Sequence, residues 1–193
     1  MCYNFDRIEE CNMELLYSFL FIIIIVGALG ILYVYQFNKL QHSKTKIDHA
    51  EYLIDDALRN KYDLLLKFDK LIQNELDVDK TYFKGLEKLK NDNVSNFDLD
   101  RKLTEYVSLL LQIKMDNEKL GDNKNFKALT NENKKYDEKL QAAKSYYNKY
   151  TAEYNDAVRT FPSNVVAKLH GFQIKAFFDG KNMEDEIVDD FKL

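Results

Sequence analysis

Two patterns of apolar positions divide the chain. Residues 15–38 contain no charged side chain, and residues 19–26 are apolar without interruption. A helix rises about 1.5 Å per residue, so about 20 apolar residues cover a hydrocarbon core of roughly 30 Å. The pattern predicts a transmembrane helix at 15–38, a short flank at 1–14 before it, and a water-facing domain at 39–193.

A cleaved signal peptide is the main alternative for the apolar run. Ala28-Leu29-Gly30 is an acceptable cleavage pattern, but residues 31–35 continue the apolar run beyond it. The flank before the run holds Arg7 among several acids, whereas a signal peptide begins with a basic region. We therefore expect the segment to be retained as an anchor.

The flanks of the apolar run predict its orientation. Tyr33 and Tyr35 lie where aromatic side chains mark a membrane boundary. The flank before the run is acidic, and three lysines follow the run: Lys39, Lys44 and Lys46. Because Lys and Arg are retained on the cytoplasmic side, we predict a single-pass cell-membrane protein with its N-terminus outside and its main domain cytoplasmic. Met13 is a second possible start, and starting there would leave the orientation to the lysines alone.

After the anchor, apolar residues recur with a helical period. The first helix is predicted over 36–76, and neither glycine nor proline separates it from the anchor. Two rows with a spacing of seven form its apolar stripe, and Lys61 interrupts the first row. The rows are Leu40, Ile47, Ile54 and Phe68, and Ala50, Ala57, Leu64 and Leu71.

Three further helical segments follow. A weak amphipathic pattern with Gly85 inside it predicts a short helix in 77–97, and residues 91–93 read as a turn. A second long helix is predicted over 97–120, with Asn96 as N-cap and an end at 121–123. The third, over 125–159, has the clearest seven-residue rows: Leu129, Tyr136, Ala143, Tyr150 and Ala157, and Phe126, Asn133, Leu140, Tyr147, Tyr154 and Phe161.

A single proline follows the third long helix. Pro162 stops that helix and can open a short final one that ends at Gly171, with Val165, Val166 and Leu169 inward. The predicted fold class is all-α: an N-terminal transmembrane helix followed by an antiparallel bundle of three long helices plus one or two short ones. A long parallel coiled-coil oligomer is the alternative, and the turns at 91–95 and 121–123 argue against it.

Composition excludes several functions. A net charge of −4 gives no basic field for nucleic acid. Cys2 and Cys11 both precede the anchor, so the domain has neither a disulfide nor a thiolate. We expect free thiols, although a bridge between the two is open if that end faces an oxidising space. The acidic residues 184–190 read as a solvated end.

The polar residues form no recognised reactive motif. None of the three histidines belongs to a Glu-x-x-His or a His-Glu-x-x-His pattern, and no phosphate loop or Gly-x-Ser-x-Gly is present. His42 and His49, with Asp48 and Glu51 nearby, lack the spacing of a metal site. We predict no catalytic, cofactor-binding or metal-binding residue, and a protein that is not an enzyme.

At two places the sequence resembles the LemA family of single-anchor bacterial membrane proteins. The first place is Tyr35, Asn38-Lys39-Leu40, Ile54-Asp55 and Arg59-Asn60-Lys61-Tyr62-Asp63-Leu64-Leu65. The second is Tyr147-Asn148, Tyr154-Asn155, Thr160-Phe161-Pro162-Ser163-Asn164, Gly171-Phe172 and Phe177-Phe178. Val188-Asp189 and Phe191 are similar to the family's terminal Val-Asp-Phe. Residues 77–120 match poorly.

The resemblance implies a helical bundle on an N-terminal anchor and carries no catalytic residue to this chain. The family usually has proline where Leu66 stands, so a straighter first helix is expected here. Some members are encoded near membrane metalloproteases, which suggests an accessory role for this chain in a protease or envelope process.

Three functional hypotheses follow. The first is a non-enzymatic interaction scaffold that binds a protein partner through an exposed helix face or through its candidate interaction residues. These are Phe161, Pro162, Ser163, Asn164, Gly171 and Phe172. The second is a sensor with a ligand pocket between bundle helices at Tyr147, Tyr150 or Tyr154. The third is a hydrolase that uses Ser163 and His170.

Overall fold

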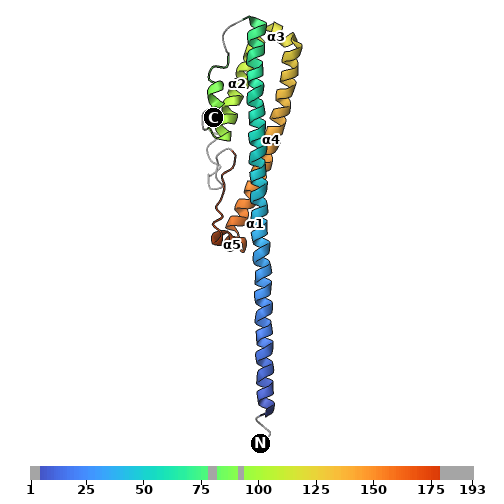
Figure 1. Ribbon diagram of the computed structural model, residues 1–193, viewed down its shortest axis with the longest axis vertical. Coiled ribbons are helices and arrows are strands. Elements are labelled where there is room, and N and C mark those ends of the chain that lie inside the picture. Colours follow the sequence, from blue (N-terminus) through green and yellow to red (C-terminus); the bar gives the residue numbers. More distant parts are fainter. Residues whose placement is uncertain (1–4, 78–81, 91–93, 179–193) are drawn as a thin grey trace, which may run out of the picture. The chain divides into compact units, whose positions relative to one another are not determined.

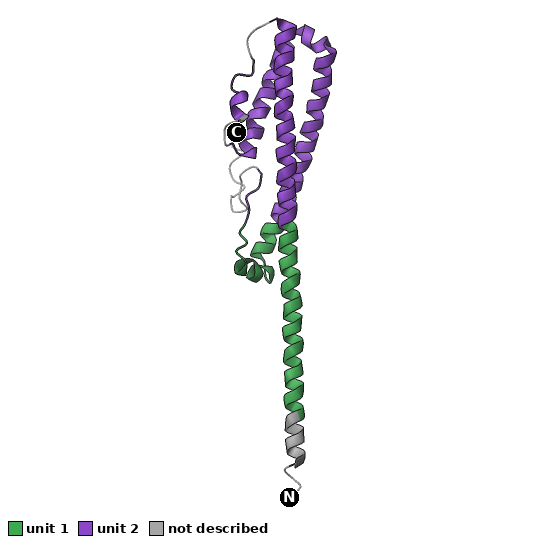
Figure 2. Ribbon diagram, in the orientation of Figure 1, with its two compact units in different colours: residues 1–43, 154–174 green, residues 44–153, 175–193 purple. Residues whose placement is uncertain are grey.

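A computed structural model of the chain describes residues 5–77, 82–90 and 94–178, with side chains from Met13 onward (Figure 1). These residues form helices and connections without strands, which confirms the predicted all-α fold. The helices are α1 (Phe5–Leu76), the 3₁₀ helix η1 (Glu87–Lys90), α2 (Asn96–Asp116), α3 (Glu118–Asp122), α4 (Lys124–Arg159) and α5 (Ser163–Leu169). The chain divides into two compact units: unit 1 has residues 1–43 and 154–174, and unit 2 has residues 44–153 and 175–193 (Figure 2).

Helix α1 is unbroken from Phe5 to Leu76, as the absence of glycine and proline after the apolar run predicts. It passes through Leu66 without interruption. In unit 1, every side chain of residues 13–35 is exposed. Among the residues described, α1 is the one helix long and apolar enough to cross a membrane, and none of its most apolar stretch is buried.

Unit 2 is built on the apolar rows of α1. The predicted residues Ile47, Ile54, Ala50, Ala57, Leu64 and Phe68 are buried. They face buried residues of the other helices: Leu103, Leu110, Ile113, Leu120, Phe126, Leu140 and Ala143. The rings of Phe68 and Phe126 meet edge to face at a centroid distance of 5.2 Å. Burying one such large side chain stabilises the fold by about 1.5–3 kcal/mol, so this shared core is the main source of stability in unit 2.

Helix α4 runs antiparallel to α1 in unit 2. The Nζ of Lys46 donates to the hydroxyl of Tyr150 at 3.1 Å, and farther along α1 the Nζ of Lys61 lies 2.7 Å from Oδ1 of Asp137. Rising residue numbers on α1 therefore meet falling numbers on α4, as the predicted antiparallel bundle requires.

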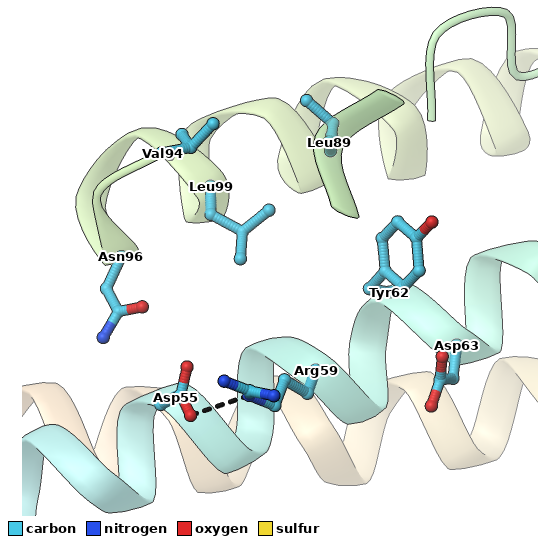
Figure 3. A pocket seen from close by; sticks show the side chains of 8 residues that line it. All are labelled: Asp55, Arg59, Tyr62, Asp63, Leu89, Val94, Asn96 and Leu99. Carbon is cyan, nitrogen blue, oxygen red and sulfur yellow. Dashed lines mark hydrogen bonds and ion pairs between the residues drawn. The ribbon is translucent and has the colours of Figure 1, made fainter. Parts of the chain in front are cut away.

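Helix α2 runs parallel to α1, because the segment before it returns along α1. Oδ1 of Asp69 accepts a hydrogen bond from the backbone N–H of Tyr82 at 3.0 Å. Nearer the N-terminus of α1, a cavity lies between α1 and this segment, with Tyr62 and Leu89 at one end and Asp55 and Asn96 at the other (Figure 3). The chain thus enters α2 beside the middle of α1, and it is α4 that is antiparallel to both.

The short helix predicted in 77–97 is replaced by a turn and the single 3₁₀ turn η1 within the residues described. Gly85 has a φ of +91°, which ends any α-helical path there. Phe83 and Leu86 are nevertheless buried, and the hydroxyl of Tyr106 donates to the carbonyl of Lys84 at 2.9 Å. The weak amphipathic pattern of 77–97 thus contains residues that are buried, but the α-helix that it predicts does not form within the residues described. The predicted turn at 91–93 lies outside the described residues.

The second predicted helix is divided in two at Asn117. This residue is extended, with φ −134° and ψ 92°, and its side chain donates to the carbonyl of Ile113 at 2.9 Å. At the start of α2, Ser95 rather than Asn96 is the N-cap, and its hydroxyl accepts from the N–H of Asp98 at 3.1 Å. Asn123 accepts from the N–H of Phe126 at 3.0 Å and so caps the start of α4.

Residues 175–178 form a strap across α1 and α4 in unit 2. The Nζ of Lys175 lies 3.3 Å from carboxylate oxygens of both Asp48 and Glu51. The N–H of Phe178 donates to Oδ1 of Asn148 at 2.9 Å. Burial of Lys175 lowers its pKa, but the attraction of Glu51 and Asp48 outweighs burial and leaves the pKa raised. The strap is therefore held by side chains of two helices.

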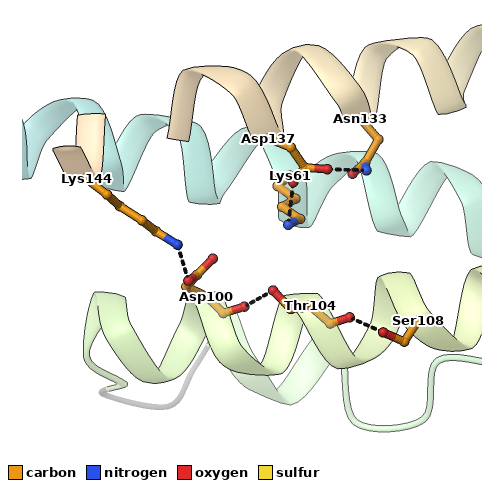
Figure 4. Close-up of polar contacts among 7 residues, drawn as sticks. All are labelled: Lys61, Asp100, Thr104, Ser108, Asn133, Asp137 and Lys144. Atoms are coloured by element: carbon orange, nitrogen blue, oxygen red, sulfur yellow. Dashed lines mark hydrogen bonds and ion pairs between the residues drawn. The ribbon is translucent and has the colours of Figure 1, made fainter. Parts of the chain in front are cut away.

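Lys61, which interrupts the apolar row of α1, is buried as an ion pair (Figure 4). Its side chain is 5 % exposed and contacts Asp137, which also accepts a hydrogen bond from Asn133 at 2.8 Å. A second ion pair joins Asp100 of α2 to Lys144 of α4. A charged pair therefore links α4 to each of the two helices beside it.

We predict that Asp137→Ala destabilises the fold, because it leaves the Lys61 ammonium buried without a partner. Breaking a buried pair costs about 3–5 kcal/mol, and since the Asp137 side chain is 43 % exposed, we expect a loss of about 2 kcal/mol. Lys61→Met is the matched control. It keeps the apolar stem and should change the free energy of unfolding by less than about 1.5 kcal/mol. Urea unfolding of the full chain in detergent measures both, and equal losses would contradict the prediction.

Candidate interaction surface

The candidate interaction residues lie in unit 1, in the segment that follows α4. We call residues 160–172 the corner. The carbonyl of Thr160 accepts hydrogen bonds from the hydroxyl of Ser163 and from the N–H of Asn164, both at 2.9 Å. The Phe161–Pro162 peptide bond is cis. The chain therefore leaves α4 at Arg159, turns at 160–162 and enters α5 with the Ser163 hydroxyl and the Asn164 N–H bonded to Thr160.

Gly171 ends α5 in a Schellman motif, as the sequence predicts. The N–H of Phe172 donates to the carbonyl of Ala167 at 2.9 Å, and the N–H of Gly171 donates to the carbonyl of Lys168 at 3.4 Å. Gly171 has a φ of +67°, a left-handed conformation that glycine adopts without the steric cost of a Cβ atom. This motif directs the chain back toward α1.

The outward face of the corner differs from the predicted one. Phe161 continues the seven-residue row of α4 in the sequence, but its side chain is 77 % exposed because the helix has already ended at Arg159. In α5, Val165 is 50 % and Leu169 is 70 % exposed, so the prediction that they face inward is wrong. Ser163, Val166 and Ala167 are the buried residues of α5.

Of the remaining candidate interaction residues, Gly171 is exposed, while Pro162, Asn164 and Phe172 are partly buried. Phe172 belongs to an aromatic cluster between α1, α4 and the end of α5. The centroid of its ring lies 6.1 Å from the ring centroid of Phe37 and 6.4 Å from that of Tyr154. The ring of His170 lies 4.7 Å from that of Phe37, and its Nε2 is hydrogen-bonded to the hydroxyl of Tyr33. The cluster attaches the corner to the end of the apolar segment of α1.

Ser163 and His170 have separate partners. The Ser163 hydroxyl donates to the carbonyl of Thr160, whereas His170 is bound to Tyr33. The two side chains therefore do not form the nucleophile–base pair that the hydrolase hypothesis requires.

The histidines of the first helix are both exposed, and the acids near His49 hold Lys175. Within the described part of the chain, no three histidine, cysteine or acidic residues are close enough together to hold a metal ion.

The tyrosine row of α4 does not converge on one pocket. Tyr147 donates to the carbonyl of Ala176 at 3.1 Å, and burial raises its pKa. The hydrogen bond from Lys46 lowers the pKa of Tyr150. Tyr154 is buried in the aromatic cluster of unit 1. Tyr147 lines a cavity of about 190 Å³ together with Phe178.

A second cavity in unit 2, of about 350 Å³, lies between α1, the returning segment and the start of α2 (Figure 3). Its charged wall belongs to α1, where Nε of Arg59 lies 2.7 Å from Oδ2 of Asp55. Leu89, Val94 and Leu99 form its apolar wall. Sequence periodicity gave no signal for this cavity, because the weak amphipathic pattern of the returning segment does not show where that segment packs.

Residues 50–189 match the LemA family. The chain belongs to the LemA family. The match begins in α1 after the apolar segment, covers all the later described helices and includes the corner. No curated protein matches the chain. The resemblance seen in the sequence is therefore confirmed, and LemA membership assigns a family without assigning a specific activity.

We predict that Gly171→Ala weakens the end of α5, because an added Cβ makes a φ of +67° unfavourable by about 1 kcal/mol. Gly121→Ala is the matched control. Gly121 is helical, and its added Cβ would meet only the Cε of Lys114, at 4.0 Å, so alanine there should be neutral or stabilising by up to about 1 kcal/mol. Hydrogen exchange at the amide of Phe172 reports the effect. Faster exchange of the Phe172 amide in the Gly121→Ala variant, or an unchanged exchange rate in the Gly171→Ala variant, would contradict the prediction.

Proposed function

We propose that this LemA-family chain is a membrane-anchored, non-enzymatic interaction module whose helical domain contacts a protein partner. The observation that carries the proposal is the exposure of the long apolar run within residues 13–35 of α1. Soluble proteins rarely expose a contiguous apolar surface of more than a few hundred Å². A lipid bilayer covers such a helix, and the bundle in unit 2 remains in water.

The continuity of α1 supports retention of the segment. The helix runs through Gly30, the predicted cleavage position, and goes on to supply the buried rows of unit 2. Exposed Lys39 and Lys44 follow the apolar segment closely. By the preference of lysine for the cytoplasmic side, we propose that the helical domain is cytoplasmic.

Two surfaces are candidates for contact. One is the corner, where the Phe161 side chain is largely exposed. The other is the face of α2 that carries Leu111 and Met115, which are four residues apart and exposed at 51 % and 82 %. A role beside a membrane protease or in an envelope process fits this reading, because it requires contact surfaces and no reactive residues.

For the anchor, we predict that the full chain stays in the membrane pellet after alkaline carbonate extraction, and that its mass retains residues 1–30. Ile23→Asp combined with Val26→Asp should release much of it, since a charge at mid-bilayer costs about 2.5–3.5 kcal/mol per residue. Protease added to intact cells should leave the domain uncut. A soluble product trimmed near Gly30 would refute the anchor, and external cleavage of the domain would reverse the orientation.

For the partner, a photoreactive amino acid at Met115 or Phe161 should give a reproducible crosslink to a protein in intact cells. Lys134, an exposed residue of α4, is the control position and should give none. If neither test position crosslinks above the control, the interaction module is refuted.

A second candidate function is small-ligand sensing, which the cavity of Figure 3 favours because it has both charged and apolar walls. Its volume is at the lower end for ligand sites. This reading differs from the first in requiring no partner: a bound small molecule alone would raise the melting temperature of the purified chain.

A further inference from the structure

Helix α5 is apolar on two opposite faces. The inward face carries Val166 and Ala167, which are buried within unit 1. The outward face carries Val165 and Leu169, which are four residues apart. Phe161 adds a third large exposed side chain just before the helix. A large apolar face of a helix is normally covered by protein or lipid, and here only one of the two faces is covered by the chain itself.

The position of α5 indicates what covers the other face. Two residues that follow the helix, His170 and Phe172, contact Tyr33 and Phe37 of α1 within unit 1. Tyr33 and Phe37 span about 6 Å of helix axis at the end of the apolar segment, where the bilayer meets water. Interfacial helices insert their apolar faces about 5–10 Å into this boundary, so α5 lies at the matching level.

The charge around α5 suits an anionic surface. Lys39 and Lys168 are exposed in unit 1. In residues 15–43 and 154–174, the sole acidic residue is Asp156, and it accepts a hydrogen bond from the Thr160 hydroxyl at 3.2 Å. Exposed lysines combined with exposed apolar side chains are the pattern by which peripheral segments bind anionic lipid headgroups, and unit 1 has both.

We propose that the corner is a second membrane contact, in which Phe161, Val165 and Leu169 insert into the surface of an anionic bilayer beside the anchor. This inference rests on the proposed anchor and names the partner of the corner as lipid. It leaves the α2 face with Met115 for the protein partner. Insertion at two points would restrict rotation of the domain about the anchor.

The absence of tryptophan from the chain allows a direct test. Leu169→Trp in the full chain, reconstituted into vesicles of phosphatidylcholine and phosphatidylglycerol, gives a single fluorescent reporter on the outward face. Lipids brominated near the headgroup end of the acyl chain should quench it at least threefold more than Met115→Trp, the control on α2. Val165→Trp should behave like Leu169→Trp, which guards against a local effect of one substitution.

Each outcome is decisive. Flotation with the vesicles reports the anchor, so a chain that does not float refutes the anchor and this inference with it. A Leu169→Trp chain that floats, but whose fluorescence is quenched no more than that of the Met115→Trp control, refutes the lipid contact alone. A reporter at position 169 that is shielded from aqueous acrylamide yet unaffected by brominated lipid shows coverage by protein, either a second copy or a partner, and also overturns it. Replacing phosphatidylglycerol by neutral lipid should reduce quenching at position 169, and unchanged quenching would refute the anionic preference.

Discussion

Helix α1 has to satisfy two different surroundings along one uninterrupted path. From Met13 to Leu32 its side chains are exposed, whereas from Leu40 to Ile72 its buried side chains are the base on which the other helices pack. Both parts are rich in apolar side chains. In the first part these side chains surround the helix, whereas in the second they form a stripe along one side. The change from all-round to one-sided apolar character, near Gln36, therefore sets where the bundle can begin.

Within the bundle, the Lys61–Asp137 pair contributes specificity more than stability. Rows of apolar residues at a spacing of seven would tolerate a slide of one helix along another, because similar side chains recur at each repeat. A buried ammonium that must meet one carboxylate on α4 does not tolerate that slide. The Asp100–Lys144 pair fixes α2 to α4 in the same way. Lys61, which interrupts the apolar row in the sequence, therefore fixes the register between α1 and α4.

Periodicity predicted the long helices and their buried faces well. The end of α1 at Leu76 and the end of α4 at Arg159 agree with the sequence, because both helices have sustained rows and Pro162 stops the second of them. The failures occur where the pattern is short. Gly85 and Asn117 change the backbone through single-residue conformations that no row reports. In α5, every apolar position fits a helix, so its inward face is decided by packing within unit 1 that the sequence does not reveal. The corner residues came from a family resemblance, and the aromatic cluster around His170 depends on tertiary contacts.

The strap at 175–178 has a separate consequence for how the domain opens. Its hydrogen bonds end on side chains, as at Asn148 and Tyr147, instead of joining a neighbouring strand or helix. Such a segment can separate from the bundle while α1 and α4 stay folded, because its separation breaks no hydrogen bond within a helix. Because Ala176, Phe177 and Phe178 of the strap line the cavity beside Tyr147, local opening of the strap would expose that cavity to solvent without unfolding of the bundle.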